Sequence, residues 1–236
     1  MNIDICFTPN DFDDEKYSKY SAVVIDVLRA TTSIATACAN GCKELIPVRT
    51  VAEANKLKAN NPDILLAGER EGLLIPGFNL GNSPFEYTRE QVASKTIVMT
   101  TTNGTLALTK ASAAQKVYAM AFVNAAAITS ALQQQQDDVV IVCAGSEGRF
   151  SLEDTLCAGL LAERFSKTAK LSDTALAAQA MYRDFAAELL PRVAESSHAS
   201  YLRSIGFEQD VMLCLQQDTL SVIPVFENGT ITACIK

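Results

Sequence analysis

The segment from Val139 to Asp154 constrains the fold of this chain more than any other stretch. Its first residues, Val139–Cys143, are apolar and mostly β-branched, which predicts a buried strand. A loop with two glycines follows, and then Ser151-Leu152-Glu153-Asp154, which predicts a helix start because a carboxylate lies three residues after the capping serine. Strand, glycine-rich loop and helix start together predict an anion-binding turn, since the N–H groups of the first helical turn point at the ligand.

The same alternation of apolar strand patterns and helical patterns continues along most of the chain. It predicts an α/β fold with three layers, in which a mostly parallel sheet has helices on both faces. We expect strands at 2–7, 21–27, 44–48, 64–67, 96–100, 116–119 and 139–143. The segment 68–84 lacks either pattern, and we expect it to be an ordered functional loop. Residues 222–226 and 230–235 flank Asn228-Gly229, which predicts a C-terminal β-hairpin.

Bulk properties narrow the class of protein. With no repeat or linker, residues 1–236 are expected to form a single domain without an internal boundary. The net charge of −7 argues against a nucleic-acid partner but not against a small phosphorylated metabolite. No apolar run approaches the ~20 residues of a membrane span, and no signal-peptide pattern begins the chain, so we expect no membrane partner and a cytoplasmic location.

The seven cysteines fit the same expectation, because most of them fall in apolar segments typical of a reduced core. Cys38 and Cys42 are four apart, but no second cysteine pair or suitable histidine is near them in sequence. Core packing therefore explains this pair better than a zinc site.

Polar loops follow four of the expected strands, at 26–32, 68–70, 101–105 and 145–154. In open α/β sheets, ligands bind outside the carboxyl ends of the strands. Four such loops at one edge of the sheet would form one site, although each alone is equally typical of a helix cap.

The charged residues of these loops suit a phosphate ester. Arg29, Arg70 and Arg149 can donate paired hydrogen bonds to an oxyanion. The carboxylates outnumber these arginines, and Mg²⁺ would resolve the imbalance because it binds one or two carboxylates together with substrate oxygens and water. Structural salt bridges at the edge of the sheet are the alternative. The carboxylates in question are Asp26, Glu69, Glu147, Glu153 and Asp154.

Several phosphatase chemistries do not match. The only histidine, His198, lies in an expected amphipathic helix, which disfavours histidine nucleophiles and Ser-His-Asp triads. Asp26 is followed by Val27 and Leu28, so the paired aspartates of haloacid-dehalogenase phosphatases are missing, as is a Walker lysine loop. Cys143 and Arg149 do have the Cys-x5-Arg spacing of cysteine-dependent phosphatases, although the charge of Glu147 between them would oppose a thiolate.

Five motifs taken together resemble the 2-phosphosulfolactate phosphatase family. They are DVLRATTSI at 26–34, GER at 68–70, GFNLGNSP at 77–84, TTNGT at 101–105 and SLED at 151–154. The resemblance implies a Mg²⁺-dependent phosphatase that converts 2-phospho-3-sulfolactate to sulfolactate, a step toward coenzyme M, and a fold unlike the common phosphatase folds. Asn79 stands where the family more often has aspartate. Related proteins that act on other phosphorylated small acids leave the pathway open.

Residues and resemblance together give a set of candidate roles. Asp26, Glu147 and Asp154 are the expected catalytic residues, and Asp26, Glu69, Glu147, Glu153 and Asp154 the expected metal ligands. The expected substrate-binding residues are Arg29, Arg70, Asn82, Ser83, Thr101, Thr102, Asn103, Gly104, Thr105, Gly145, Ser146, Gly148 and Arg149.

Two alternative functions stay open. One is a cysteine enzyme that uses Cys143 and Arg149 and needs no metal. The other is a non-catalytic protein that binds phosphorylated or sulfonated acids at the same edge of the sheet. The alanine-rich helices are compatible with a homo-oligomer, and equally with packing in a core.

Overall fold

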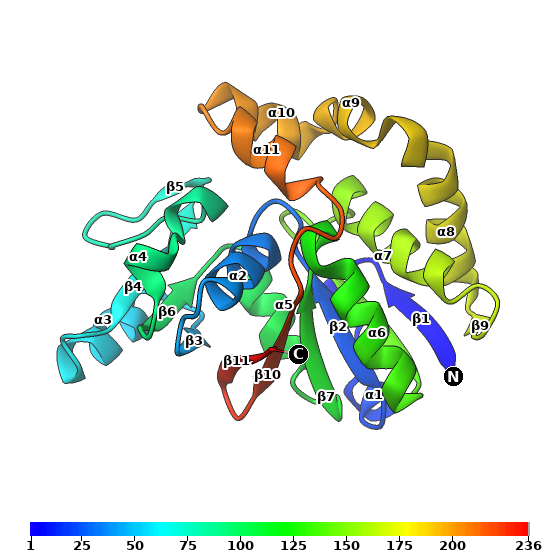
Figure 1. Cartoon of the computed structure of the whole chain (residues 1–236), viewed down its shortest axis with the longest axis horizontal. Coiled ribbons are helices and arrows are strands. Elements are labelled where there is room, and N and C mark those ends of the chain that lie inside the picture. The colour runs from blue at the N-terminus through cyan, green and yellow to red at the C-terminus, as the bar shows by residue number, and fades with distance from the viewer. Residues whose placement is uncertain (236) are drawn as a thin grey trace.

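The computed structural model describes residues 1–235, in which eleven strands form one sheet in the order β5-β4-β6-β3-β11-β10-β7-β2-β8-β1-β9 (Figure 1). The strands are β1 (Asn2–Cys6), β2 (Ser21–Ile25), β3 (Glu44–Pro47), β4 (Leu65–Arg70), β5 (Leu73–Leu74), β6 (Thr96–Thr100), β7 (Lys116–Met120), β8 (Val139–Cys143), β9 (Lys170–Leu171), β10 (Val222–Glu227) and β11 (Thr230–Ile235).

The sheet consists of two parallel blocks that an antiparallel hairpin joins. One block is β4-β6-β3 and the other is β7-β2-β8-β1-β9. Between them, β10 pairs antiparallel with β7, and β11 pairs antiparallel with β3. The turn of this hairpin places Asn228 at φ 51° and Gly229 at φ 81°, the left-handed conformation that a two-residue hairpin turn requires.

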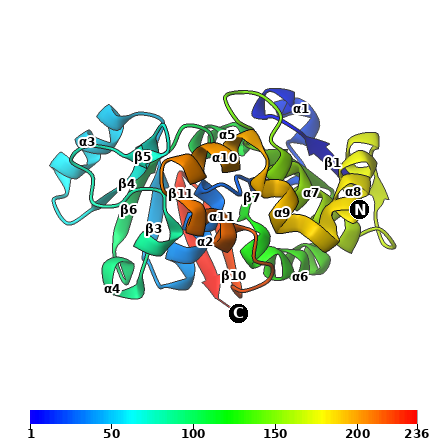
Figure 2. The ribbon, with the colours of Figure 1, turned by 90° about the horizontal axis from the view of Figure 1, so that it is seen from above.

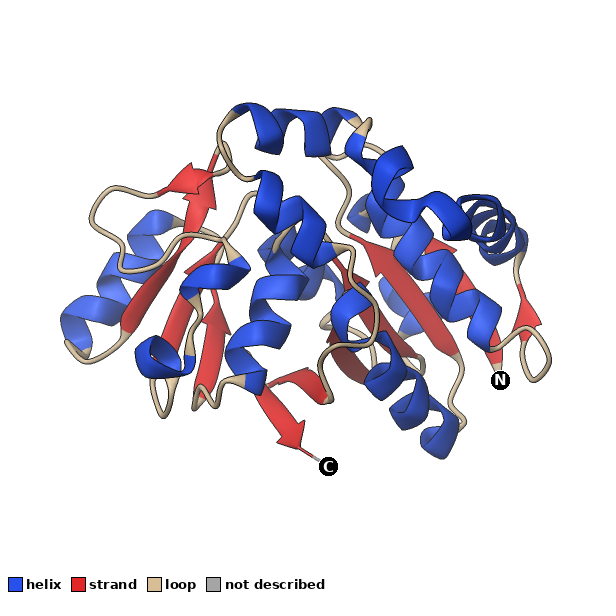
Figure 3. Ribbon diagram, turned by 45° about the horizontal axis from the view of Figure 1, so that its top comes forward, coloured by secondary structure: helices blue, strands red, loops and turns tan. Residues whose placement is uncertain are grey.

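Helices cover both faces of the sheet (Figure 3). They are α1 (Asp14–Tyr17), α2 (Ala30–Ala39), α3 (Val51–Asn60), α4 (Arg89–Val92), α5 (Gly104–Ala111), α6 (Ala125–Gln135), α7 (Leu152–Arg164), α8 (Asp173–Phe185), α9 (Leu189–Ala194), α10 (Ser197–Ser204) and α11 (Glu208–Cys214). None of these helices is long and apolar enough to cross a membrane.

The alternation of side chains along β2 explains the layers. Val23 and Ile25 face a core shared with α6 and α7, whereas Ala22 and Val24 face a second core shared with α2 and α5. All four side chains are fully buried, as expected for a central strand of a parallel sheet. The three-layer α/β architecture and the C-terminal hairpin predicted from the sequence are thus confirmed.

One boundary differs from the sequence prediction. The strand expected to end at Ala67 continues as β4 through Gly68, Glu69 and Arg70, and it pairs at its end with β5. Gly68 has φ 145°, and a Cβ there would lie 2.0 Å from the carbonyl oxygen of Thr100 on β6. The glycine therefore allows close approach of two strands and does not begin a loop.

The short helices α9, α10 and α11 lie across the carboxyl ends of the parallel strands (Figure 1). In the view from above, α10 and α11 lie over the middle of the molecule (Figure 2). This C-terminal part of the chain therefore covers the carboxyl ends of the parallel strands, where the sequence predicted the ligand site.

Candidate active site

Asp26 follows β2 and lies at the start of α2. Its Oδ1 accepts a hydrogen bond of 3.2 Å from the backbone N–H of Ala30. The Thr31 hydroxyl donates to the Asp26 carbonyl at 2.8 Å and accepts from the Asp26 N–H at 3.0 Å. The Arg-Ala-Thr-Thr motif thus fixes the backbone that carries this carboxylate.

The Asp26 side chain is buried near both acidic and basic groups. Burial raises the pKa of Asp26 to about 6; the charges of Glu69 and Glu153 add to this rise, while His198 and the Ala30 N–H oppose it. A buried carboxylate near two others favours either a proton or a cation at this place. On the other side, a Cβ on Gly104 would lie 2.8 Å from Asp26 Oδ2, so the glycine at the start of α5 makes room for the carboxylate.

Glu69 lies at the end of β4 and organises two neighbouring turns. Its Oε1 accepts hydrogen bonds from the backbone N–H and hydroxyl of Thr102, at 2.8 and 2.9 Å. Its Oε2 accepts a bond of 2.8 Å from the Gly72 N–H. Arg70 is half-buried beside it and donates to the Thr100 hydroxyl at 3.0 Å. These contacts join two of the loops that the sequence placed at one site.

Asp154 connects the remaining loops. Its Oδ1 accepts from the Val27 N–H at 2.8 Å, and its Oδ2 accepts from the Gly145 N–H at 3.1 Å. Ser151 caps α7 as predicted, because its hydroxyl accepts the Asp154 N–H. Burial raises the pKa of Asp154 well above its ordinary value, and the charges of Asp26 and Glu153 add to this. Both oxygens of the Asp154 carboxylate thus accept hydrogen bonds from the backbone of neighbouring loops.

The loop after β8 is exposed from Glu147 onward. Glu147 has φ 52°, and its N–H donates to Asn103 Oδ1 at 3.3 Å, which links this loop to the turn before α5. The backbones of Ser146 and Arg149 pair with each other. A Cβ on Gly145, at φ 69°, would lie 2.4 Å from the Arg149 carbonyl oxygen, so this tight loop needs glycine there.

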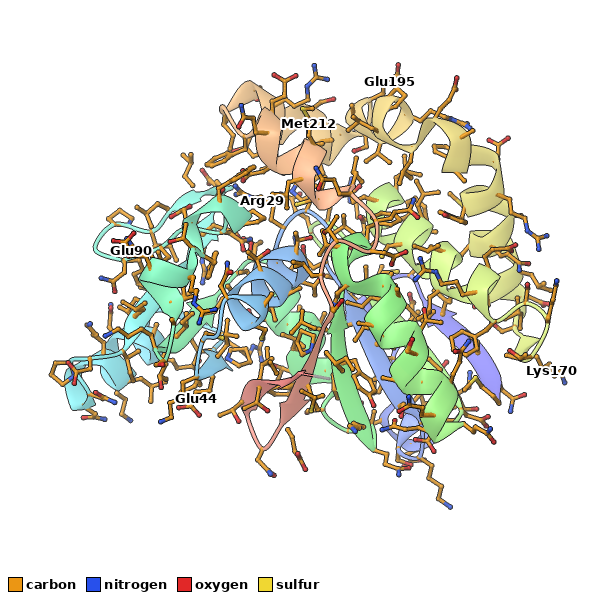
Figure 4. All side chains as sticks on the ribbon, viewed as in Figure 1. Arg29, Glu44, Glu90, Lys170, Glu195 and Met212 are labelled. Carbon is orange, nitrogen blue, oxygen red and sulfur yellow. The ribbon has the colours of Figure 1, made fainter. Side chains whose placement is uncertain are left out.

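The guanidinium group of Arg29 is buried and makes its contacts with other residues of the protein. Its Nη1 lies 2.7 Å from Asp210 Oδ2, its Nη2 donates to the Gly72 carbonyl at 2.6 Å, and its guanidinium lies 4.1 Å from the ring centroid of Phe207. Asp210 also accepts a hydrogen bond of 2.8 Å from the Ser83 hydroxyl. Figure 4 shows Arg29 where the α10–α11 segment meets the sheet edge. The predicted oxyanion donor therefore also holds this C-terminal segment.

His198 and Glu153 form a second contact across this interface. His198 Nδ1 lies 3.0 Å from Glu153 Oε1, and the Glu153 side chain is only 3% exposed. Burial alone lowers the pKa of His198, but the hydrogen bond and charge of Glu153 outweigh it, so that the pKa is raised. Glu153 therefore stabilises the protonated imidazole relative to the neutral ring.

These elements surround a cavity of about 300 Å³. The predicted site residues that line it are Asp26, Arg29, Glu69, Arg70, Asn82, Thr102, Asn103, Ser146 and Glu147. The other predicted site residues do not line it; they are Ser83, Thr101, Gly104, Thr105, Gly145, Gly148, Arg149, Glu153 and Asp154. Several of these residues make hydrogen bonds behind the lining of the cavity. Thr101 and Thr105 bond to each other at the start of α5, and Ser83 bonds to Asp210, the partner of Arg29.

Cys143 does not line this cavity. It is fully buried, and burial raises the pKa of its thiol well above the ordinary value, with the charge of Asp154 adding to the shift. Arg149 is exposed on the loop outside the cavity. Because thiolate catalysis needs a lowered thiol pKa, the structure disfavours the cysteine alternative.

The sequence motifs did not point to the residues that α10 contributes. His198, Tyr201 and Leu202 line the cavity, and the Tyr201 hydroxyl donates to the Glu71 carbonyl at 3.0 Å. The only available signal was that His198 is the single histidine of the chain. Nothing in its local pattern placed α10 over the carboxyl ends of strands more than 50 residues earlier in the chain.

Comparison with known proteins agrees with the motifs. A family model described as 2-phosphosulpholactate phosphatase matches residues 6–229. The chain belongs to this family. The resemblance first seen in five short motifs is thereby confirmed, and it extends over nearly the whole chain, including the α9–α11 segment.

Individual members of the 2-phosphosulfolactate phosphatase family are similar over most of their length. A probable 2-phosphosulfolactate phosphatase of Symbiobacterium thermophilum is 42% identical over 215 residues, which cover 89% of this chain and 92% of that protein. One of the same name from Clostridium beijerinckii is 38% identical over 239 residues and covers 98% of this chain and 99% of its own.

Proposed function

We propose that this chain is a Mg²⁺-dependent phosphatase that hydrolyses 2-phospho-3-sulfolactate, or a similar small phosphorylated acid, to the hydroxy acid and phosphate. The observation that carries the proposal is the position of Asp26: a buried carboxylate that lines the cavity between the starts of α2 and α5. Family membership and the names of the relatives support the reaction and the substrate. The role in coenzyme M formation stays a prediction.

The charges of the cavity support the requirement for a cation. The lining includes the carboxylates of Asp26, Glu69, Glu71 and Glu147, against Arg29, Arg70 and His198, and Arg29 is already paired with Asp210. A substrate with phosphate, sulfonate and carboxylate groups would add further negative charge. A divalent cation between carboxylates and phosphate oxygens makes such a complex favourable.

The donor atoms fit a hard cation. Asp26, Glu69 and Glu147 line the cavity and offer carboxylate oxygens. Asn82 also lines it, and its side-chain oxygen is buried without a hydrogen-bond partner among the described residues. Within residues 1–235, no three acidic, histidine or cysteine side chains gather closely enough to hold an ion by themselves. Mg²⁺ commonly keeps several waters and binds through one or two carboxylates and the substrate, which agrees with such a sparse set.

We therefore assign Asp26 as the central ligand, with Glu69 or Glu147 as the second carboxylate. Glu153 and Asp154 are left out of this set, because neither lines the cavity. When bound, Mg²⁺ would neutralise charge on the phosphate and orient the attacking water. Arg70 and Asn103, which line the cavity, would bind the phosphate oxygens.

The test is a phosphate-release assay on 2-phosphosulfolactate with chelator and with Mg²⁺ restored. We expect activity only with Mg²⁺, and a loss of orders of magnitude in Asp26→Asn. Activity that persists in chelator would contradict the cation requirement. Tight substrate binding without any phosphate release, with Mg²⁺ present, would instead indicate the non-catalytic binder.

A further inference from the structure

His198 belongs to the site by position but has no role in the scheme above. It projects from α10, and other residues of this helix hold it against the rest of the protein. Ala199 and Leu202 are buried in the core, and the Tyr201 hydroxyl donates to the Glu71 carbonyl. The His198 side chain is 25% exposed and lines the same cavity as Asp26. The helix therefore does not need this imidazole for its packing.

The partner of His198 fixes the orientation of the ring. Glu153 lies in the first turn of α7, almost completely buried, with Oε1 at 3.0 Å from His198 Nδ1. With Nδ1 occupied by a carboxylate, Nε2 is the nitrogen left for a ligand in the cavity. A carboxylate behind an imidazole also stabilises the protonated ring, as in other acid–base pairs.

The reaction needs a proton at one defined atom. Hydrolysis of a secondary alkyl phosphate expels the oxygen of an aliphatic alcohol, and an alkoxide is a poor leaving group in water near neutral pH. A positioned acid that protonates this oxygen as the bond to phosphorus breaks contributes about 10²–10⁴-fold in rate. Neither Arg29 nor Arg70 can supply that proton, because guanidinium groups stay protonated.

We propose that His198 is the general acid of this phosphatase and that Glu153 is its positioning residue. The inference rests on the proposed hydrolysis of a phosphate monoester. The oxygen of water forms a bond to phosphorus, and the ester P–O bond breaks with its electron pair on the ester oxygen. That oxygen takes the proton of His198 Nε2. A proton released by the attacking water restores the imidazolium, so the net reaction is ester plus water to alcohol plus phosphate.

The experiment compares 2-phosphosulfolactate with its analogue in which sulfur replaces the bridging ester oxygen. A thiolate leaves without protonation, so the analogue keeps the binding groups but removes the need for an acid. For His198→Gln we expect kcat to fall about 10²–10³-fold on the oxygen ester and less than about tenfold on the sulfur ester. Glu153→Gln should show the same selectivity with a smaller loss. Ser200→Ala, an exposed change on α10, is the matched control and should leave both rates unchanged.

An equal fold-loss on both esters would overturn the proposal and assign His198 to binding or structure, as would an unchanged rate on the oxygen ester. The wild-type protein separates these outcomes from failure of the proposed function. If the wild type releases no phosphate from either ester with Mg²⁺ present, the proposed hydrolysis of 2-phosphosulfolactate is wrong, and the general-acid role proposed for it is wrong as well.

Discussion

Nη1 of Arg29 lies 2.7 Å from Oδ2 of Asp210, and the two side chains are only 1% and 5% exposed. This pair joins the first motif of the site to α11, which lies 181 residues further along the chain. Removing one partner of a buried ion pair leaves an uncompensated charge away from water. The pair is therefore expected to determine whether the C-terminal segment stays on the site.

Asp210→Ala should lower the free energy of unfolding by about 3–5 kcal/mol, because it leaves the Arg29 guanidinium buried without its carboxylate. Denaturant unfolding measures this change. Glu163→Ala is the control, since Glu163 pairs with Arg183 on the surface and should cost less than about 1 kcal/mol. Equal losses in the two variants would show that the buried pair does not hold the segment.

Gly104→Ala should reduce kcat/KM by about tenfold to a hundredfold while the protein stays folded. The added Cβ would lie 2.6 Å from the Ala30 Cβ and 2.8 Å from Asp26 Oδ2, so the carboxylate and the start of α2 have to move. Lys110→Ala, on the exposed end of α5, serves as the control. A Gly104→Ala enzyme within twofold of wild type would mean that Asp26 tolerates displacement.

Asp4 gives a prediction for the dependence of stability on pH. Burial raises the pKa of this carboxyl, but hydrogen bonds from Lys16, Ser172, Tyr17 and Thr174 outweigh it, so the folded pKa lies well below the ordinary 3.8. A depressed pKa contributes stability that is present above the unfolded pKa and is lost as pH falls toward the folded one. The contribution is therefore complete at neutral pH and declines below about pH 4.

Asp4→Asn should consequently cost about 1–2 kcal/mol of unfolding free energy at pH 7 and clearly less at pH 2, because the contribution is lost gradually between the unfolded and the much lower folded pKa. Urea unfolding at the two pH values measures the difference. Asp63→Asn, which changes an exposed carboxylate before β4, is the comparison. A cost for Asp4→Asn that does not shrink in acid would rule out the charge as its source.

Cys143→Ala should retain most phosphatase activity. The thiol is buried outside the cavity, and burial raises its pKa well above the usual value, so it does not supply a thiolate nucleophile. The measurement is phosphate release in the presence of Mg²⁺. Complete loss of activity in a variant that unfolds like the wild type would restore the cysteine mechanism.

Local sequence signals predicted local structure well. The capping serine of α7 and the Asn228-Gly229 turn both form as expected, since each depends on residues within a few positions. The position of the hairpin in the sheet did not follow from the sequence. It depends on pairings such as Val225 with Tyr118 and Ile231 with Leu45, which are distant in the chain.

The candidate site shows the same division. The strand ends brought Asp26, Glu69 and Glu147 to one cavity, because carboxyl ends of parallel strands meet at one edge. Which of the other carboxylates face that cavity was not predictable, because Asp154 meets the Val27 N–H across 127 residues. His198 was missed for the same reason: its partner Glu153 is 45 residues earlier.

The β10–β11 hairpin also has a consequence for biosynthesis. Both parallel blocks precede the hairpin in chain order, yet the hairpin alone bridges β3 and β7. While the nascent chain leaves the ribosome, each block is therefore exposed at the strand edge that will later face its neighbour. Closure of the sheet has to wait until residues 222–235 emerge, because only then can β11 pair with β3 and β10 with β7.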